Sequence, residues 1–112
     1  MDQLIILQSL REEDFLLKTL QQLQREFSRI GIDFPELSTT TSFDEAQQEV
    51  QLILNTIIHD NPESLPHLLY IIDLSEIKVR KLIDRSENSA NDLAYAILLR
   101  CAEKVYWKKK FQ

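Results

Sequence analysis

Glycine, proline and cysteine are all scarce in this sequence of 112 residues, which contains one glycine, three prolines and one cysteine. Tight turns depend on glycine and proline, so a chain with so few of them is poorly suited to a hairpin-rich β fold. A single cysteine excludes an intramolecular disulfide, and no other feature indicates an oxidising compartment. These absences favour a helical protein of the cytoplasm.

Long apolar runs are also absent. No stretch approaches the roughly 18 residues that are needed to cross a bilayer. The N-terminal sequence MDQLIILQSLREEDF has a short apolar run, early acidic residues and no basic leader, so it is not typical of a signal peptide. We therefore expect no membrane span and a cytoplasmic location.

The residues that are present fit one globular domain. Apolar residues make up 44% of the chain and charged residues 28%, which is ordinary globular usage and excludes a disordered tail. The net charge of −5 is unevenly distributed, because residues 1–61 carry −7 and residues 62–112 carry +2. Both signs are mixed within each half, so a solvated surface explains the pattern, and different partners for the two halves are the alternative.

Apolar residues recur at three- and four-residue steps through most of the chain, which is typical of amphipathic helices. The apolar run LIIL at residues 4–7 either extends the first helix backward or forms a separate buried turn. The expected fold is an all-α, single-domain bundle of four to five helices, with a loop at 31–42. The expected helices span about 2–30, 43–59, 63–72, 76–84 and 90–110.

Several residues fit the ends of these helices. Ser9 with Glu12, and Ser42 with Glu45, have capping-box spacing. Gly31 follows the last apolar position of the first helix, where a left-handed residue is favoured.

Residues 68–84 raise the question of DNA binding, because they predict two helices joined by a short turn. The stretch resembles a helix-turn-helix unit, with Asp73 at the turn and Lys78, Arg80 and Lys81 on the second helix. Leu69 departs from that pattern, since a small residue is expected where the helices cross. An acidic protein also offers phosphate a weak positive field. A helical corner that completes the core is the preferred interpretation, and DNA binding is the alternative.

The sequences LLYIIDLSEIKVRKLI and DLAYAILLRCAEKVYWKKKF carry a resemblance that covers residues 66–111. This part of the chain is similar to small uncharacterised all-helical bacterial proteins. The resemblance implies a helical fold and a bacterial cytoplasmic setting. It implies no activity and no functional residue.

Catalytic, cofactor and metal signatures are missing. One glycine rules out a glycine-rich phosphate loop, and nothing provides a nucleophile with a strained turn or an oxyanion hole. His59 and His67 are the only histidines, and one distant cysteine adds little to a zinc site. Cys101 has apolar neighbours and is expected to be a small buried residue. We expect a protein that is not an enzyme and needs no cofactor or metal.

The C-terminal sequence VYWKKKF, residues 105–111, joins aromatic residues to three lysines. It could contact nucleic acid or an anionic membrane surface. The preferred interpretation is that the lysines complement the dipole at the end of a helix while an aromatic residue packs.

The remaining hypothesis is a non-catalytic helical protein that acts by protein–protein interaction. An apolar N-terminal run needs cover from a neighbour, which could be a protein partner or a second copy of the chain. The expected interface residues are Leu4, Ile5, Leu7 and Leu10.

Overall fold

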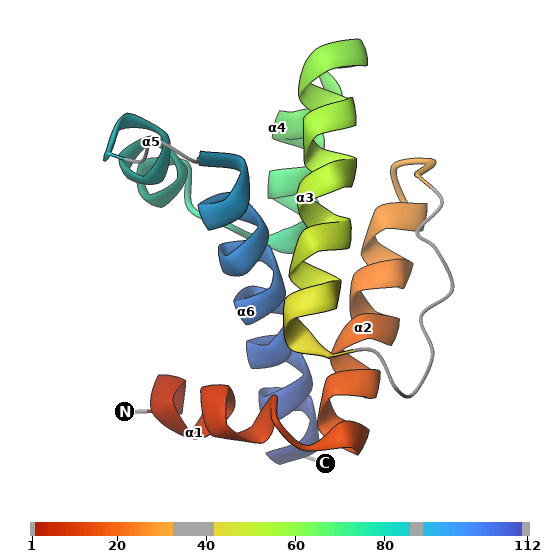
Figure 1. Cartoon of the computed structure of the whole chain (residues 1–112), viewed down its shortest axis with the longest axis vertical. Helices are drawn as coiled ribbons and strands as arrows, with labels where there is room; N and C mark the ends of the chain where they lie inside the picture. Colours follow the sequence, from red (N-terminus) through yellow and green to blue (C-terminus); the bar gives the residue numbers. More distant parts are fainter. Residues whose placement is uncertain (1, 33–41, 86–88, 111–112) are drawn as a thin grey trace.

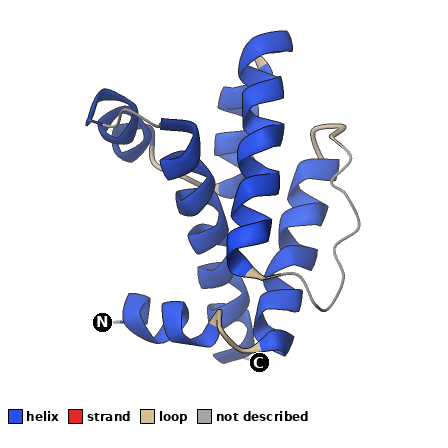
Figure 2. Cartoon of the chain, in the orientation of Figure 1, coloured by secondary structure: helices blue, strands red, loops and turns tan. Residues whose placement is uncertain are grey.

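The computed structural model describes residues 2–32, 42–85 and 89–110 of the chain. Every regular element in these ranges is an α-helix, which confirms the predicted all-α fold (Figure 2). The helices of the described residues are α1 (Asp2–Ser9), α2 (Glu13–Ser28), α3 (Phe43–Asp60), α4 (Ser64–Ile72), α5 (Glu76–Arg85) and α6 (Ser89–Lys110).

The long helix α6 lies at the centre of the arrangement. Helices α2 and α3 pack along one side of it, α5 contacts its first half, and α1 contacts its second half (Figure 1). The short helix α4 lies behind α3 and also contacts α2 and α6. The radius of gyration is 13.5 Å, close to the roughly 13 Å expected for a compact chain of this length.

The first expected helix, residues 2–30, is divided into two. Helix α1 ends at Ser9, whose carbonyl accepts a hydrogen bond from the Glu12 N–H at 2.9 Å. Ser9 is therefore not the N-cap of a longer helix, and the capping box expected with Glu12 does not form. The break turns α1 across the end of α6 (Figure 1), which buries Ile6 and Leu10 against the core. A continuous helix would carry both side chains past the end of that core.

Other helix ends follow the sequence signals. Ser42 accepts from the backbone N–H of Glu45, and the Glu45 carboxylate accepts from the Ser42 N–H, so the predicted capping box is confirmed. Gly31 has a φ of +77°, and the N–H of Ile32 donates to the carbonyl of Phe27 at 3.1 Å. This pattern closes the end of α2 through a left-handed residue, as the position of the glycine predicts.

The hydrophobic core forms where α2, α3, α4 and α6 meet. The predicted apolar stripes largely supply it, although Leu17, Phe43 and Ile53 are only half-buried. Close approach of the helices to α6 is helped by its fully buried alanines, Ala94 and Ala102. The largest fully buried apolar side chains are Phe27, Ile6, Leu20, Leu23, Leu54, Leu68, Ile72, Leu93, Ile97, Leu98 and Val50.

A buried ion pair links three of the core helices. Glu26 of α2 is 3% exposed and lies 2.5 Å from the Nζ of Lys104 on α6. The same ammonium donates to the carbonyl of Ile71 in α4 at 3.2 Å, and the Gln22 amide donates to Glu26 at 3.0 Å. A buried carboxylate is tolerated only when it is paired in this way. The pair therefore fixes how α2, α4 and α6 lie against one another.

Removing the positive charge of Lys104 alone should destabilise the fold. We expect Lys104→Met to lower the free energy of unfolding by about 3 kcal/mol, because Glu26 would stay buried without its counter-ion. The double change Glu26→Leu with Lys104→Met should restore most of this loss, since neither charge remains. Urea denaturation followed by circular dichroism measures both values, and equal losses in the single and double variants would contradict this account.

Candidate protein-binding groove

Two faces of helix α6 differ in their surroundings. One face is buried in the core and carries Leu93, Ala94, Ile97, Leu98, Cys101, Ala102 and Val105. The other follows the steps of a helical stripe and borders an open groove. This second stripe consists of Asp92, Tyr95, Ala96, Leu99, Arg100, Glu103 and Trp107.

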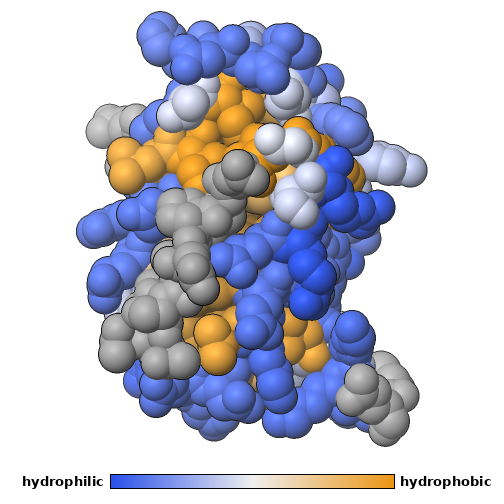
Figure 3. Space-filling view, turned by 90° about the vertical axis from the view of Figure 1, so that its right-hand side faces the viewer, coloured by the Kyte–Doolittle hydropathy of each residue, from blue (hydrophilic) through white to orange (hydrophobic). Residues whose placement is uncertain are grey.

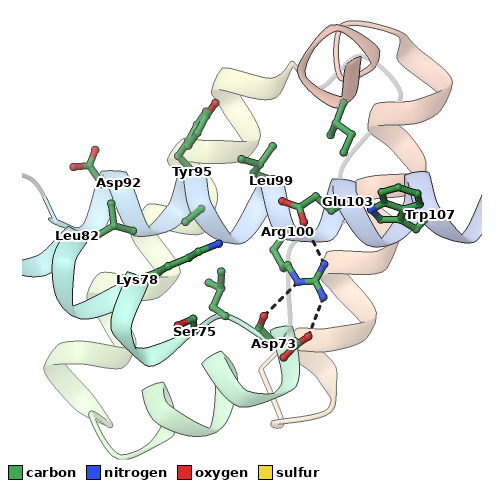
Figure 4. Close-up of a pocket in the computed structure, with 13 residues that line it drawn as sticks. Asp73, Ser75, Lys78, Leu82, Asp92, Tyr95, Leu99, Arg100, Glu103 and Trp107 are labelled. Atoms are coloured by element: carbon green, nitrogen blue, oxygen red, sulfur yellow. Dashed lines mark hydrogen bonds and ion pairs between the residues drawn. The ribbon is translucent and has the colours of Figure 1, made fainter. Parts of the chain in front are cut away.

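This depression, which we name the α6 groove, has a volume of about 770 Å³. Its floor is the second stripe of α6. Lys78 and Leu82 of α5 form one wall, together with the turn at residues 73–75, and Ile6 of α1 borders the other end (Figure 4). Helices α1 and α5 both project from the same side of α6 (Figure 1), and residues of both line the groove that lies between them.

The turn between α4 and α5 is held onto α6 by Arg100. Asp73, which the sequence places at the turn, has a φ of +68°, in the left-handed region. The Arg100 guanidinium donates to the Asp73 carboxylate at 2.9 Å and to its backbone carbonyl at 3.3 Å, and it also contacts Glu103 at 3.3 Å (Figure 4). This double contact fixes the wall of the groove relative to its floor.

The groove presents apolar surface beside charges of both signs. Leu74, Leu82 and Tyr95 supply apolar contacts, and the edge of the Tyr95 ring packs against Phe43 with 5.9 Å between ring centroids. Lys78 and Asp92 line the groove and have no ion-pair partner among the described residues. Such a surface matches an amphipathic partner with flanking charges.

The four predicted interface residues lie in different environments on and beside α1. Leu4 and Ile5 are 64% and 47% exposed, so they are large apolar side chains in contact with solvent. Leu7 is half-buried and packs against the core, and Leu10 is only 3% exposed. The structure therefore leaves Leu4 and Ile5 available for contact and places Leu10 inside the protein.

The three predicted nucleic-acid contacts, Lys78, Arg80 and Lys81, are all exposed on α5. They do not form one face, because Lys78 points into the α6 groove (Figure 4). Helix α5 packs mainly on α6 rather than on α4, in keeping with the bulky Leu69 at the expected crossing point.

Sequence reasoning missed the second stripe of α6, including Tyr95, Arg100 and Trp107. The signal was present, since residues 92, 96, 99, 103 and 107 follow three- and four-residue steps. It was hidden because α6 also carries a longer apolar stripe for the core. The link between Arg100 and Asp73 joins residues 27 positions apart, and only the fold brings them together.

In the described residues, Cys101, His59 and His67 do not form a catalytic or metal-binding arrangement. Burial, and after it the nearby Glu26 carboxylate, raise the pKa of the Cys101 thiol well above its ordinary value, which keeps it protonated and unreactive. His59 and His67 are exposed. In the described ranges, no three side chains of His, Cys, Asp or Glu gather closely enough to hold a metal ion.

A smaller hollow of about 360 Å³ lies over the second half of α3. Ile32, Leu52, Ile53 and Ile57 line it, and Leu52 is 60% exposed. Apolar residues gather in the upper part of this side of the molecule (Figure 3). The α6 groove is twice as large and combines apolar contacts with charges, so it is the stronger candidate for a specific binding site.

Comparison with protein-family models, with curated proteins and with solved structures found no match to this chain. None of the helices in the described part of the chain combines the length and the low charge that crossing a lipid bilayer requires.

Two substitutions at Asp73 should separate backbone strain from the ion pair. Asp73→Ala should lower the free energy of unfolding by about 1–2 kcal/mol, because alanine pays the left-handed penalty and loses the contact with Arg100. Asp73→Gly should stay within about 0.5 kcal/mol of the wild type, since glycine adopts this conformation freely. Chemical denaturation measures the difference, and an equal loss in both variants would show that the ion pair dominates.

Proposed function

We propose that this chain is a non-catalytic helical protein that binds an amphipathic helix of a protein partner in the α6 groove. The observation that carries the proposal is the open groove of about 770 Å³ along the second stripe of α6, which leaves room for a further element between α1 and α5. The groove combines apolar side chains with charges of both signs, which suits a helix that is apolar on one face and charged at its edges.

The shape of the groove supports a helix as its occupant. Two projecting helices flank a central one, and a helix laid on α6 between them would contact three elements at once (Figure 1). Ala96 lies on the floor and gives such a helix room to approach. Tyr95 and Trp107 are half-buried and supply aromatic anchors of the kind that usually carry the binding energy of a protein interface.

The chemistry of the groove supports binding rather than catalysis. Its cations and carboxylates are either paired with each other, as at Arg100 and Glu103, or spread over different walls. The cytoplasmic and bacterial setting remains a prediction from the sequence.

The occupant is either another protein or a second copy of this chain. Leu4 and Ile5 of α1 are exposed on the helix that also supplies Ile6 to the groove. Burying both side chains against either occupant would stabilise the complex by roughly 1–3 kcal/mol.

Filling the groove tests this function without removing a core contact. Ala96→Arg places a long side chain over the floor and should abolish partner binding while changing the free energy of unfolding by less than about 0.5 kcal/mol. Gln48→Arg is the matched control, because it adds the same residue at an exposed site on α3, outside the groove.

Two measurements test whether partner binding is lost. Sedimentation of the purified chain detects a second copy, and affinity purification from the source cells with quantitative mass spectrometry detects another protein. Binding that Gln48→Arg keeps and Ala96→Arg loses supports the groove. If Ala96→Arg retains the wild-type mass and every wild-type partner, the groove is not the binding site.

DNA binding through residues 68–84 remains the alternative proposal. The left-handed Asp73 and the exposed Arg80 and Lys81 favour it. The orientation of Lys78 into the groove and the packing of α5 on α6 weigh against it.

Charge reversal separates this alternative from the groove. If α5 binds DNA, changing Lys78, Arg80 and Lys81 to Glu should abolish duplex affinity measured by fluorescence anisotropy at low salt. The matched control changes Lys108, Lys109 and Lys110 to Glu. A wild-type chain without measurable duplex affinity, or a loss confined to the control, would eliminate DNA binding through α5.

A further inference from the structure

A second cleft, on the side of α6 that faces α2, gathers positive charge. It has a volume of about 220 Å³, and its lining includes four basic side chains and no acidic one. The chain as a whole has a net charge of −5, so this concentration of cations runs against the overall charge. We name it the cation cleft, and its basic residues are Lys18, Arg25, Lys108 and Lys109.

The cleft is assembled by the packing of α2 against the end of α6. Lys18 and Arg25 are seven residues apart, which places them on one face of α2 and about 10 Å apart along its axis. The last turn of α6 adds Lys108 and Lys109 opposite them, and the buried Val105 forms part of the floor. Gln21 and Gln22 lie between the two α2 cations and add amide groups.

The guanidinium of Arg25 is held in position from inside the protein. Its Nη2 donates to the Oε1 of Gln22 at 2.8 Å, and the Nε2 of Gln22 donates to the buried Glu26 at 3.0 Å. Glu26 is in turn fixed by Lys104. The bond to Gln22 uses one of the five N–H groups that a guanidinium carries. A surface arginine with this support loses less conformational freedom when it binds an anion than a free one does.

Negative charge near the cleft does not cancel its cations. Asp14 lies 3.3 Å from Lys18, but the Asp14 side chain is 77% exposed and the Lys18 side chain 49% exposed, so solvent screens the pair. The end of α6 carries the negative pole of the helix dipole, which three lysines in the last turn offset. Of these, Lys110 lies over the rings of Tyr106 and Trp107 and does not line the cleft.

We propose that the cation cleft binds an oligophosphate, meaning two or more linked phosphate groups, either in a free molecule or in the headgroup of a lipid. Four cations with no lining carboxylate match a ligand of several negative charges better than a single carboxylate. The positioned guanidinium of Arg25 suits bidentate binding of phosphate, and the lysines act as point charges.

The volume limits the ligand to its phosphate part. About 220 Å³ corresponds to roughly seven water molecules at about 30 Å³ each. This is room for a few linked phosphates and too little to enclose a drug-sized organic molecule, whose pockets usually exceed about 300 Å³. The cation cleft shares no lining residue with the α6 groove. The test of oligophosphate binding is therefore independent of the test of protein binding in the groove.

The test uses the full chain and two probes, tripolyphosphate in solution and vesicles that contain a phospholipid whose headgroup carries at least two phosphate groups. Calorimetry measures the first and vesicle sedimentation the second, both at low salt. Changing Arg25 and Lys109 together to Gln should weaken binding at least tenfold. Arg25→Lys should also weaken it, because the charge remains but the guanidinium held by Gln22 is lost. The matched control changes Arg11 and Arg29 to Gln, which removes the same charge from exposed sites outside both the α6 groove and the cation cleft.

The outcomes separate the sources of the phosphate. Binding of tripolyphosphate that the cleft variant loses and the control keeps supports a free ligand, and the same pattern with vesicles alone supports a headgroup. Equal losses in the cleft variant and the control would mean a general effect of charge and overturn the proposal. A wild-type chain that binds neither probe also overturns it.

Discussion

The fold depends on the central helix α6, which contacts every other described helix. In the described ranges, each of the other five helices packs against α6, so its 22 residues must supply both core contacts and surface contacts. Alanines on its core face allow close approach, and Lys104 and Arg100 on its flanks bind α2 and the α4–α5 turn. A change in the position of α6 would therefore move the core, the α6 groove and the cation cleft together.

Much of the fold was predictable because burial follows helical periodicity. The stripes on α2, α3 and α6 identified most core residues, and the local signals at Ser42, Gly31 and Asp73 marked where helices begin or end. The break at residues 10–12 was not predictable from such signals. Ser9 and Glu12 have the spacing of a helix start, yet the contacts of Ile6 and Leu10 with the core select a helix end at Ser9.

The candidate sites were less predictable, since they depend on contacts between distant segments. Leu4, Ile5, Leu7 and Leu10 were all expected at an interface, but only Leu4 and Ile5 are exposed, while Leu7 packs against the core and Leu10 lies inside it. The apolar run does not itself reveal which of its side chains the core takes up. The groove required the contact of Arg100 with Asp73, and the cation cleft required α2 beside the last turn of α6. The sequence showed Lys18 and Arg25 seven residues apart, but only tertiary packing brings Lys108 and Lys109 opposite them.

The position of Trp107 has a practical consequence. It is the single tryptophan of the chain, it is partly exposed, and it lines the α6 groove with its ring edge-on to Tyr106. The colour of indole emission depends on whether the ring faces water or an apolar contact. Whatever enters the groove from this end exchanges one environment for the other, so the protein contains its own optical reporter of occupancy and needs no attached dye.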